Sequence, residues 1–283
     1  MNALLLTAWL AWGGALAQDT ALELRRGDRV VVEGISGELR VETWDRAALD
    51  IRGDDEDPIG IDASREGDRV VLRAADRKHR GLDVDAVLRV PDWVDLEVQG
   101  RSVDVRISGV AGSVDVRNVS GDIRTEDTRG ALTLSSVEGE IVVLGARGSV
   151  TALSRGNDVR MRDVVGAVDA ESGSADVLLR NVDAGSVRAE TLNGDVFFSG
   201  TLADGGSYWF SVHDGDADFE LPSDVGAEVT VSTFDGEFTS DFPVVVQRYG
   251  GGGVFDFTLG NGGARLEIQV FDGEIELRRR EGR

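Results

Sequence analysis

A run of alternating acidic residues is the part of the sequence best suited to bind a metal ion. Asp214, Asp216, Asp218 and Glu220 occupy every second position, so a β-strand would place all four carboxylates on one outer face. Carboxylate oxygens are ligands that Ca²⁺ prefers. Neighbours on one face of a strand lie roughly 7 Å apart, however, so chelation needs help from an adjacent strand. The alternative, a row of carboxylates in contact with solvent, is favoured because the chain lacks the G-G-x-G-x-D pattern of calcium-binding repeats.

Two aromatic residues are candidates for contact with a ligand. Aromatic side chains make up 6% of the chain, so exposed ones are informative. The alternation of inward and outward positions points the rings of Phe197 and Trp209 outward, on consecutive strands. We therefore expect the two rings near each other, as an exposed patch that suits the flat face of a sugar. In the alternative, which is slightly favoured, the glycine-rich residues 250–263 fold over both rings as a cap.

Several other chemistries lack the residues that they need. The chain has no cysteine, which excludes thiol chemistry and disulfides, and its two histidines, His79 and His213, exclude a histidine-rich metal site. No G-x-S-x-G motif marks a serine nucleophile, although composition does not exclude a Ser/His/Asp arrangement. The glycines at 250–253 precede no Walker lysine, and no cofactor is predicted. A net charge of −22 argues against nucleic-acid binding, which needs a basic face.

Glycine recurs at a regular interval through residues 100–245, and this repeat organises the chain. In each of two interleaved series, the spacing is 17 to 21 residues. The glycines of the first series are followed by small residues: Gly112, Gly130, Gly148, Gly166, Gly185, Gly206 and Gly226. Those of the second are mostly followed by acidic or polar residues: Gly121, Gly139, Gly156, Gly173, Gly194, Gly215 and Gly236. Such a period is typical of a repeat array.

The residues between the glycines predict an all-β chain. Apolar and polar residues alternate after each glycine, which is the pattern of a strand with one buried face. We expect each unit of 17–21 residues to form one coil of a β-solenoid (a β-helix), with coils stacked about 4.8 Å apart. Val116, Leu134, Ile141, Val177 and Phe219 should point into the core, and Thr133 outward. A β-sandwich, which also has short strands at regular spacing, is the alternative.

Residues 1–17 have the features of a secretory signal peptide. The apolar run from Ala3 to Trp12 is short for a membrane span, and Ala15-Leu16-Ala17 is a small-x-small cleavage site. We therefore expect export to the periplasm, the cell surface or the medium, with no transmembrane segment in the mature chain. A retained N-terminal anchor is the alternative.

The remaining chain divides into two parts. Residues 18–100 show a less regular pattern, and we expect them to form the first coils and an end cap. The strands expected there are 29–33, 37–43, 49–52, 69–73, 86–90 and 95–98. Residues 101–283 are expected to form the solenoid repeats, with a glycine-rich break near 250–263 after which the array resumes.

Three stretches resemble a bacterial β-strand-repeat family labelled "putative adhesin", whose function is unknown. They are Gly37–Val41 with the following Trp44-Asp45, then Arg89–Val98, and finally Gly262–Ile268 with Phe271–Leu277. From the first to the last, they span residues 37–277, which is nearly all of the mature chain. The resemblance implies a β-helical, exported bacterial protein. It supplies no catalytic residues.

Two classes of function follow from these features. The first is a non-catalytic binding or structural protein of the cell envelope, because a solenoid offers long flat faces. Its partner is an unidentified envelope or surface component, either a glycan or a protein. The second is a carbohydrate-active enzyme of the β-helix type that acts on a polysaccharide. The first is favoured because no pair of acidic residues is expected to recur on adjacent coils.

Overall fold

The computed structural model describes residues 22–53, 61–74, 85–245, 248–249 and 253–280. The expected signal peptide and part of the glycine-rich break lie outside these ranges. The all-β prediction is confirmed, since the described residues form 25 strands hydrogen-bonded into one large sheet. They contain no helix, and thus none of the length and apolarity that a membrane span requires.

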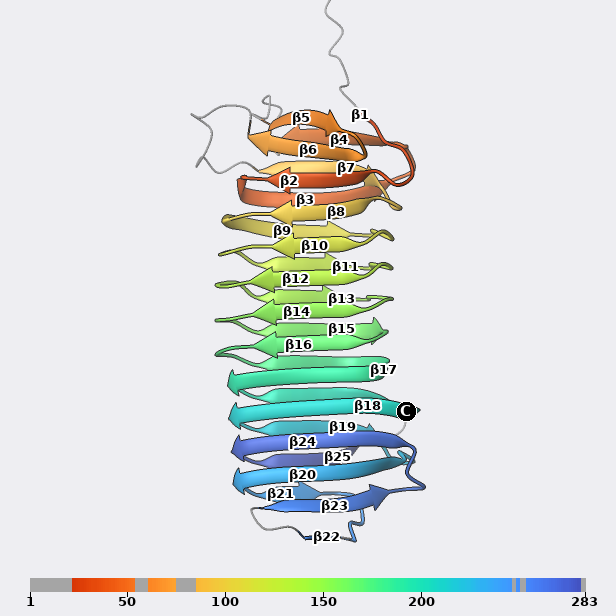
Figure 1. The fold of residues 1–283 in the computed structure, drawn as a ribbon, viewed down its shortest axis with the longest axis vertical. Coiled ribbons are helices and arrows are strands. Elements are labelled where there is room, and N and C mark those ends of the chain that lie inside the picture. The colour runs from red at the N-terminus through yellow and green to blue at the C-terminus, as the bar shows by residue number, and fades with distance from the viewer. Residues whose placement is uncertain (1–21, 54–60, 75–84, 246–247, 250–252, 281–283) are drawn as a thin grey trace, which may run out of the picture.

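The strands form two ladders, which Figure 1 shows as layers stacked along the long axis. The first ladder contains β6 (Arg69–Ala74), β2 (Arg29–Glu33), β8 (Asp95–Gln99), β10 (Val114–Arg117), β12 (Leu132–Ser136), β14 (Val150–Ser154), β16 (Val168–Ser172), the second parts of β17 (Val177–Asn193) and β18 (Val196–Asp214), then β24 (Ala264–Asp272), β20 (Ala227–Asp235), β23 (Val254–Leu259) and β22 (Arg248–Tyr249). The second contains β4 (Ala48–Gly53), β7 (Ala86–Pro91), β3 (Ser36–Trp44), β9 (Ser102–Ser108), β11 (Ile123–Glu126), β13 (Ile141–Leu144), β15 (Val159–Val165), the first parts of β17 and β18, then β19 (Ala217–Pro222), β25 (Ile275–Arg280) and β21 (Phe238–Ser240). Two further strands pair antiparallel near the N-terminal end, β1 (Leu22–Glu23) with β4 and β5 (Ile61–Glu66) with β6. All six strands expected between residues 29 and 98 are present.

Most strands pair in parallel with the strand one circuit later, in a constant register. In the second ladder Ile123 pairs with Ile141, and Ile141 with Val159. The first ladder shows the same offset of 18 residues between Val114 and Leu132. Because the strands pair in register, residues of the inner face lie above residues of the inner face, and outward residues lie above outward residues.

Close packing at the corners requires several glycines of the first series. The Cα of Gly130 packs against the carbonyl oxygen of Gly112, and a Cβ built on Gly130 would lie 2.0 Å from that oxygen. Gly148 and Gly166 pack in the same way, each on the glycine one circuit earlier. Any larger residue would push neighbouring circuits apart.

The core fills the space between the two ladders. Val116, Leu134, Ile141, Val177 and Phe219 are fully buried, as predicted. A column of buried hydroxyl groups, which the sequence did not indicate, lines one inner corner. Each hydroxyl donates a hydrogen bond to a backbone carbonyl of the turn: Ser136 to Gly121, Ser154 to Gly139, Ser172 to Asn157 and Thr191 to Ala175. These bonds give the buried hydroxyl groups partners among the turn carbonyls.

At each end of the stack, one strand lies out of its sequence order, which the sequence did not indicate. Strand β2 lies between β6 and β8, although β6 follows it in the sequence. Strand β24 lies between β18 and β20, although it follows β20. Figure 1 shows both insertions. The chain therefore resumes its array after residue 263 by placing β24 between two strands that precede it in the sequence. Gly226 and Gly263, although 37 residues apart, stand at the starts of directly adjacent strands.

Candidate functional site

The two predicted aromatic residues do not come together. The outward phase of Trp209 is confirmed, because it is half-buried between the fully buried Tyr208 and Phe210. Trp209 belongs to the first ladder, where it pairs with Arg188, whereas Phe197 belongs to the second, where it pairs with Leu178. Outward side chains of the two ladders point to opposite sides of the molecule. The expectation that the rings are neighbours is therefore wrong.

An arginine lies over each of these rings. The guanidinium of Arg188 is 4.3 Å from the centroid of the Trp209 ring, and that of Arg180 is 4.2 Å from the Phe197 ring. Both geometries are cation–π contacts. The expected cap is absent from the described part of residues 250–263, because β23 pairs with β20 and the neighbour of Trp209 on that side is Glu267 of β24.

The predicted carboxylate row bends around a corner instead of following one strand. Asp214 ends β18, Gly215 turns the chain with a φ of 139°, and Asp218 and Glu220 lie in β19. The Asp216 carboxylate accepts the backbone N–H of Glu274 at 2.8 Å. Within the described ranges, no group of three or more acidic or histidine residues has an arrangement that could hold a metal ion.

Asp218 is the member of this row with a perturbed acidity. Burial raises the pKa of its carboxyl group, and the nearby carboxylates of Glu276, Asp216 and Asp195 raise it further. The Arg278 guanidinium, 3.4 Å away, opposes this shift. Asp218 thus serves as the partner of an arginine on the adjacent strand.

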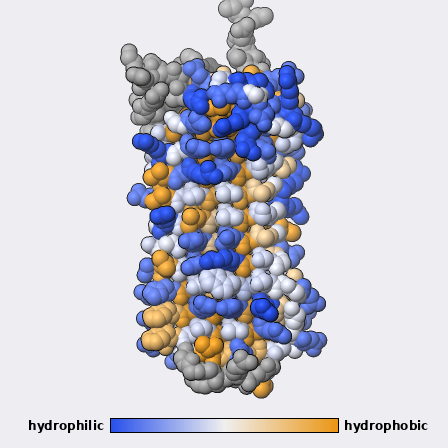
Figure 2. Space-filling model, in the orientation of Figure 1, coloured by the Kyte–Doolittle hydropathy of each residue, from blue (hydrophilic) through white to orange (hydrophobic). Residues whose placement is uncertain are grey.

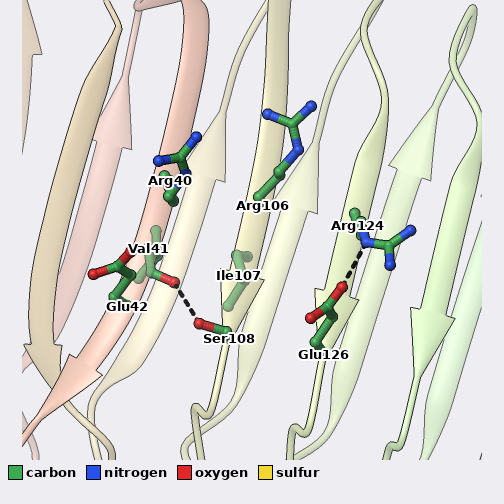
Figure 3. A pocket seen from close by; sticks show the side chains of 8 residues that line it. All are labelled: Arg40, Val41, Glu42, Arg106, Ile107, Ser108, Arg124 and Glu126. Carbon is green, nitrogen blue, oxygen red and sulfur yellow. Dashed lines mark hydrogen bonds and ion pairs between the residues drawn. The ribbon is translucent and has the colours of Figure 1, made fainter. Parts of the chain in front are cut away.

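The outer face of the second ladder gathers arginine and apolar side chains from six successive strands. Figure 3 shows Arg40 of β3, Arg106 of β9 and Arg124 of β11, which lie side by side around a shallow depression of about 160 Å³. Arg40 and Arg106 share the Glu38 carboxylate, and the hydrogen bond from Arg106 is the main cause of the lowered pKa of Glu38. Arg124 donates to Glu126 at 2.6 Å.

A second depression on the same face has an apolar floor and a basic rim. It has a volume of about 330 Å³. Half-buried Val142, Leu144 and Leu178 form its apolar part. Four arginines and one glutamate provide its charged groups: Arg124, Arg160, Arg162, Arg180 and Glu140. We call Arg106, Arg124, Val142, Leu144, Arg160, Arg162, Leu178 and Arg180 the arginine face.

The local sequence explains how this face forms. Arg124 and Val142 follow Gly121 and Gly139 by three positions, which is an outward position of the strand. The register then adds Arg160 and Leu178 to the same column. Guanidinium groups bind carboxylates and phosphates, while the aliphatic floor can contact the carbon skeleton of a ligand. The sequence contained part of this signal, since the alternation after Gly121 and Gly139 places Arg124 and Val142 outward, but the 18-residue register was needed to join them to the others.

Acidic residues do recur on adjacent circuits, contrary to expectation. At one corner each carboxylate accepts the backbone N–H of the acidic residue one circuit later, for example Asp104 from Asp122 and Asp122 from Glu140, both at 2.9 Å. These three acids also line a depression of about 310 Å³ together with Arg106 and Arg124. The prediction missed this column because its acids come from the turns and the strand starts.

Comparisons with known proteins give little further information. No family model and no curated protein matches the chain. A solved structure described as a "putative cell adhesion protein", from Clostridium sporogenes, aligns with 92% of this chain and 97% of its own at 8% identity, with a TM-score of 0.27. A likeness this remote carries no inference about fold or function.

Proposed function

We propose that the chain is an exported, non-catalytic β-solenoid of the cell envelope or the medium, with an adhesin-like binding or structural role. Its coils span 18 residues in the regular region, and the constant register of the two ladders supports this architecture. Export is supported by the cleavage site at Ala15-Leu16-Ala17. The mature protein should therefore begin at Gln18, which N-terminal sequencing of the exported protein tests; an intact Met1 would contradict export.

The arginine face is the observation that carries the binding role. Its side chains repeat at the strand spacing of about 4.8 Å, so a flat, periodic surface faces any extended molecule that lies along the stack. At the second depression, Arg160 pairs with Glu140 and Asp158, and Arg124 pairs with Glu126, whereas no carboxylate of the described residues pairs with Arg162 or Arg180. These two guanidinium groups favour an acidic ligand. The partner that fits best is an acidic glycan, whose carboxylates would bind the guanidinium groups and whose ring carbons would contact Val142, Leu144 and Leu178.

A comparison of acidic and neutral polysaccharides tests this role. The mature chain should bind polygalacturonate and not dextran, and binding should weaken as salt screens the exposed arginines. The double variant Arg160→Gln/Arg162→Gln should bind at least tenfold more weakly. Arg117→Gln, which removes an exposed arginine from the first ladder, is the matched control. Equal binding of both polysaccharides, or unchanged binding by the double variant, would contradict the proposal.

A polysaccharide-cleaving enzyme is the second candidate, favoured by one observation. Asp104, Asp122 and Glu140 line a depression beside Arg106 and Arg124, and paired carboxylates serve glycoside hydrolysis. Two of these acids, Asp104 and Asp122, already accept backbone hydrogen bonds, which favours a structural role. Release of reducing ends from polygalacturonate, abolished in Glu140→Gln, would establish the enzyme and contradict the non-catalytic role.

A further inference from the structure

Four strands of the first ladder end at the same corner and place their next side chains in one column. Thr191 pairs with Val212, and Val212 and Thr233 both pair with Val270. The residues that follow these four therefore stack on one another: Leu192, His213, Phe271 and Phe234. The rings of His213 and Phe271 lie 4.8 Å apart at 22°, and those of Phe271 and Phe234 lie 4.8 Å apart and nearly parallel, at 1°. We call these four residues the ring column.

The ring column is exposed to a degree that is unusual for large apolar residues. Phe234 is 75% exposed, Leu192 52% and Phe271 48%. Leaving a phenylalanine in water forgoes the free energy that its burial would give. A shallow depression of about 440 Å³ adjoins the column, and Figure 2 shows hydrophobic colour along the edge where β18, β24 and β20 end. A contiguous exposed apolar patch of this kind marks an interaction site.

A column of carboxylates runs directly beside the rings. Asp214 pairs with Asp272, and Asp272 with Asp235, so the three aspartates stack one residue beyond the ring column. All three are exposed, and none forms an ion pair with an arginine of the described residues. Glu190, which also lines the adjoining depression, is paired with Arg188, so the negative charge comes from the aspartates. An apolar ridge flanked by negative charge complements a partner that is both apolar and basic.

The orientation of the rings decides which apolar group fits. Phe271 is stacked on both faces, by His213 and by Phe234, so its ring offers only its edge, whereas Phe234 at the end of the column keeps one free face. A sugar finds only that one face at the end of the column, and the three aspartates beside the rings favour a cationic partner over a glycan. Ring edges instead favour an aromatic side chain that offers its own face, in an edge-to-face contact.

We propose that the ring column and its aspartates bind a segment of a partner protein that carries basic and aromatic side chains. Lysine or arginine of the segment pairs with Asp214, Asp272 and Asp235, and an aromatic side chain covers the edges of Phe234 and Phe271. The net charge of −22 attracts such a segment from a distance. This surface lies at a corner of the first ladder and is independent of the arginine face.

Labelled peptides test the proposal by fluorescence anisotropy with the mature chain. A peptide in which lysine alternates with tryptophan should bind. Phe234→Ser/Phe271→Ser should weaken its binding at least tenfold, and Asp235→Asn/Asp272→Asn should weaken it and reduce its salt dependence. Val165→Ser, which removes an exposed apolar residue from the opposite corner, should bind like the wild type. Unfolding midpoints of all variants establish that each is folded.

Three results would overturn the proposal. One is equally tight binding of a peptide in which lysine alternates with serine, since charge alone would then suffice. Another is unchanged binding by Phe234→Ser/Phe271→Ser. The third is self-association of the wild type in sedimentation experiments that this variant abolishes, since the ring column would then bind a second copy of the chain.

Discussion

The Asp195 carboxylate accepts the backbone N–H of Asp216, one circuit later, at 2.9 Å. Asp176 accepts the N–H of Asp195 in the same way, at 2.9 Å. The acidic residues that follow the second glycine series thus join successive turns of the stack. Their role explains why carboxylates recur at this corner without gathering around a metal ion.

Replacement of Asp195 separates this structural role from a charge effect. Asp195→Ala removes the acceptor for the Asp216 amide and should lower the free energy of unfolding by about 1 kcal/mol. Asp195→Asn keeps an acceptor oxygen without the charge and should lie between the alanine variant and the wild type. Urea unfolding of the three proteins provides the comparison, and equal stability of alanine and asparagine variants would show that the hydrogen bond contributes nothing.

Two glycines of the same series should respond differently to alanine. A Cβ on Gly130 would lie 2.0 Å from the Gly112 carbonyl oxygen, whereas a Cβ on Gly185 would meet nothing within 4 Å. Gly130→Ala should therefore destabilise the protein by about 1–3 kcal/mol or more through overpacking. Gly185→Ala should be neutral or slightly stabilising, because alanine restricts the unfolded chain. Similar thermal midpoints for the two variants would contradict the packing of the corners.

The alternation of faces predicts opposite outcomes for two aspartate substitutions. Ile141 is fully buried, so Ile141→Asp would place an uncompensated charge in the core and should prevent stable folding. Thr133 is exposed on the outer face of β12, so Thr133→Asp should change the melting temperature little. Comparable losses from both substitutions would mean that the two faces are exchanged.

Asp28 should contribute stability that depends on pH. Burial alone would raise the pKa of its carboxyl group, but hydrogen bonds from the Arg25 amide at 2.7 Å and the Arg65 guanidinium at 2.8 Å bring it below the ordinary value. A lowered pKa gives stabilisation that is complete above the unfolded-state value of about 3.9 and is lost as pH falls through the folded-state value. Asp28→Asn should thus be less stable than the wild type at pH 7, and the difference should shrink below about pH 4.

Melting temperatures between pH 7 and pH 2.5 measure this effect. Asp45→Asn, which removes the charge of an exposed aspartate, is the control. A difference between wild type and Asp28→Asn that stays constant over the whole range would rule out the ion pair with Arg65 as its source.

The strands and their faces could be predicted from the sequence because they depend on local patterns. Alternation around Ile141 and Phe219 identified the inward side, and the glycines identified corners. Two glycines of the second series, Gly156 and Gly173, do not occupy the turn position that Gly121 and Gly139 hold. The carbonyl at that position, which accepts the hydrogen bond of a buried hydroxyl, belongs to Asn157 and to Ala175 in these circuits. A register is set by pairing partners and not by glycine alone.

The order of strands at the two ends could not be predicted, and the candidate sites depend on it. Spacing along the chain does not reveal that β24 inserts between β18 and β20, because that choice is made by tertiary pairing. The insertion is what brings Phe271 between His213 and Phe234. The expectation that Phe197 and Trp209 are neighbours failed for a related reason, since the two parts of β18 that carry them belong to opposite ladders.

Distances between spin labels test the proposed solenoid most directly. The chain has no cysteine, so pairs of introduced cysteines can carry the labels without background. Glu97 is the fixed position, and the second label is placed in the same outward column, at Asp169, Arg188, Trp209, Glu267 or Thr230. The solenoid predicts separations that grow by about 4.8 Å for each strand, from about 19 Å at Asp169 to about 34 Å at Glu267 and about 38 Å at Thr230. Glu267 should therefore be nearer than Thr230 although it follows it in the sequence. Separations that fail to grow along the column, as in a sandwich that folds back on itself, would contradict the stacked architecture and both binding faces built on it.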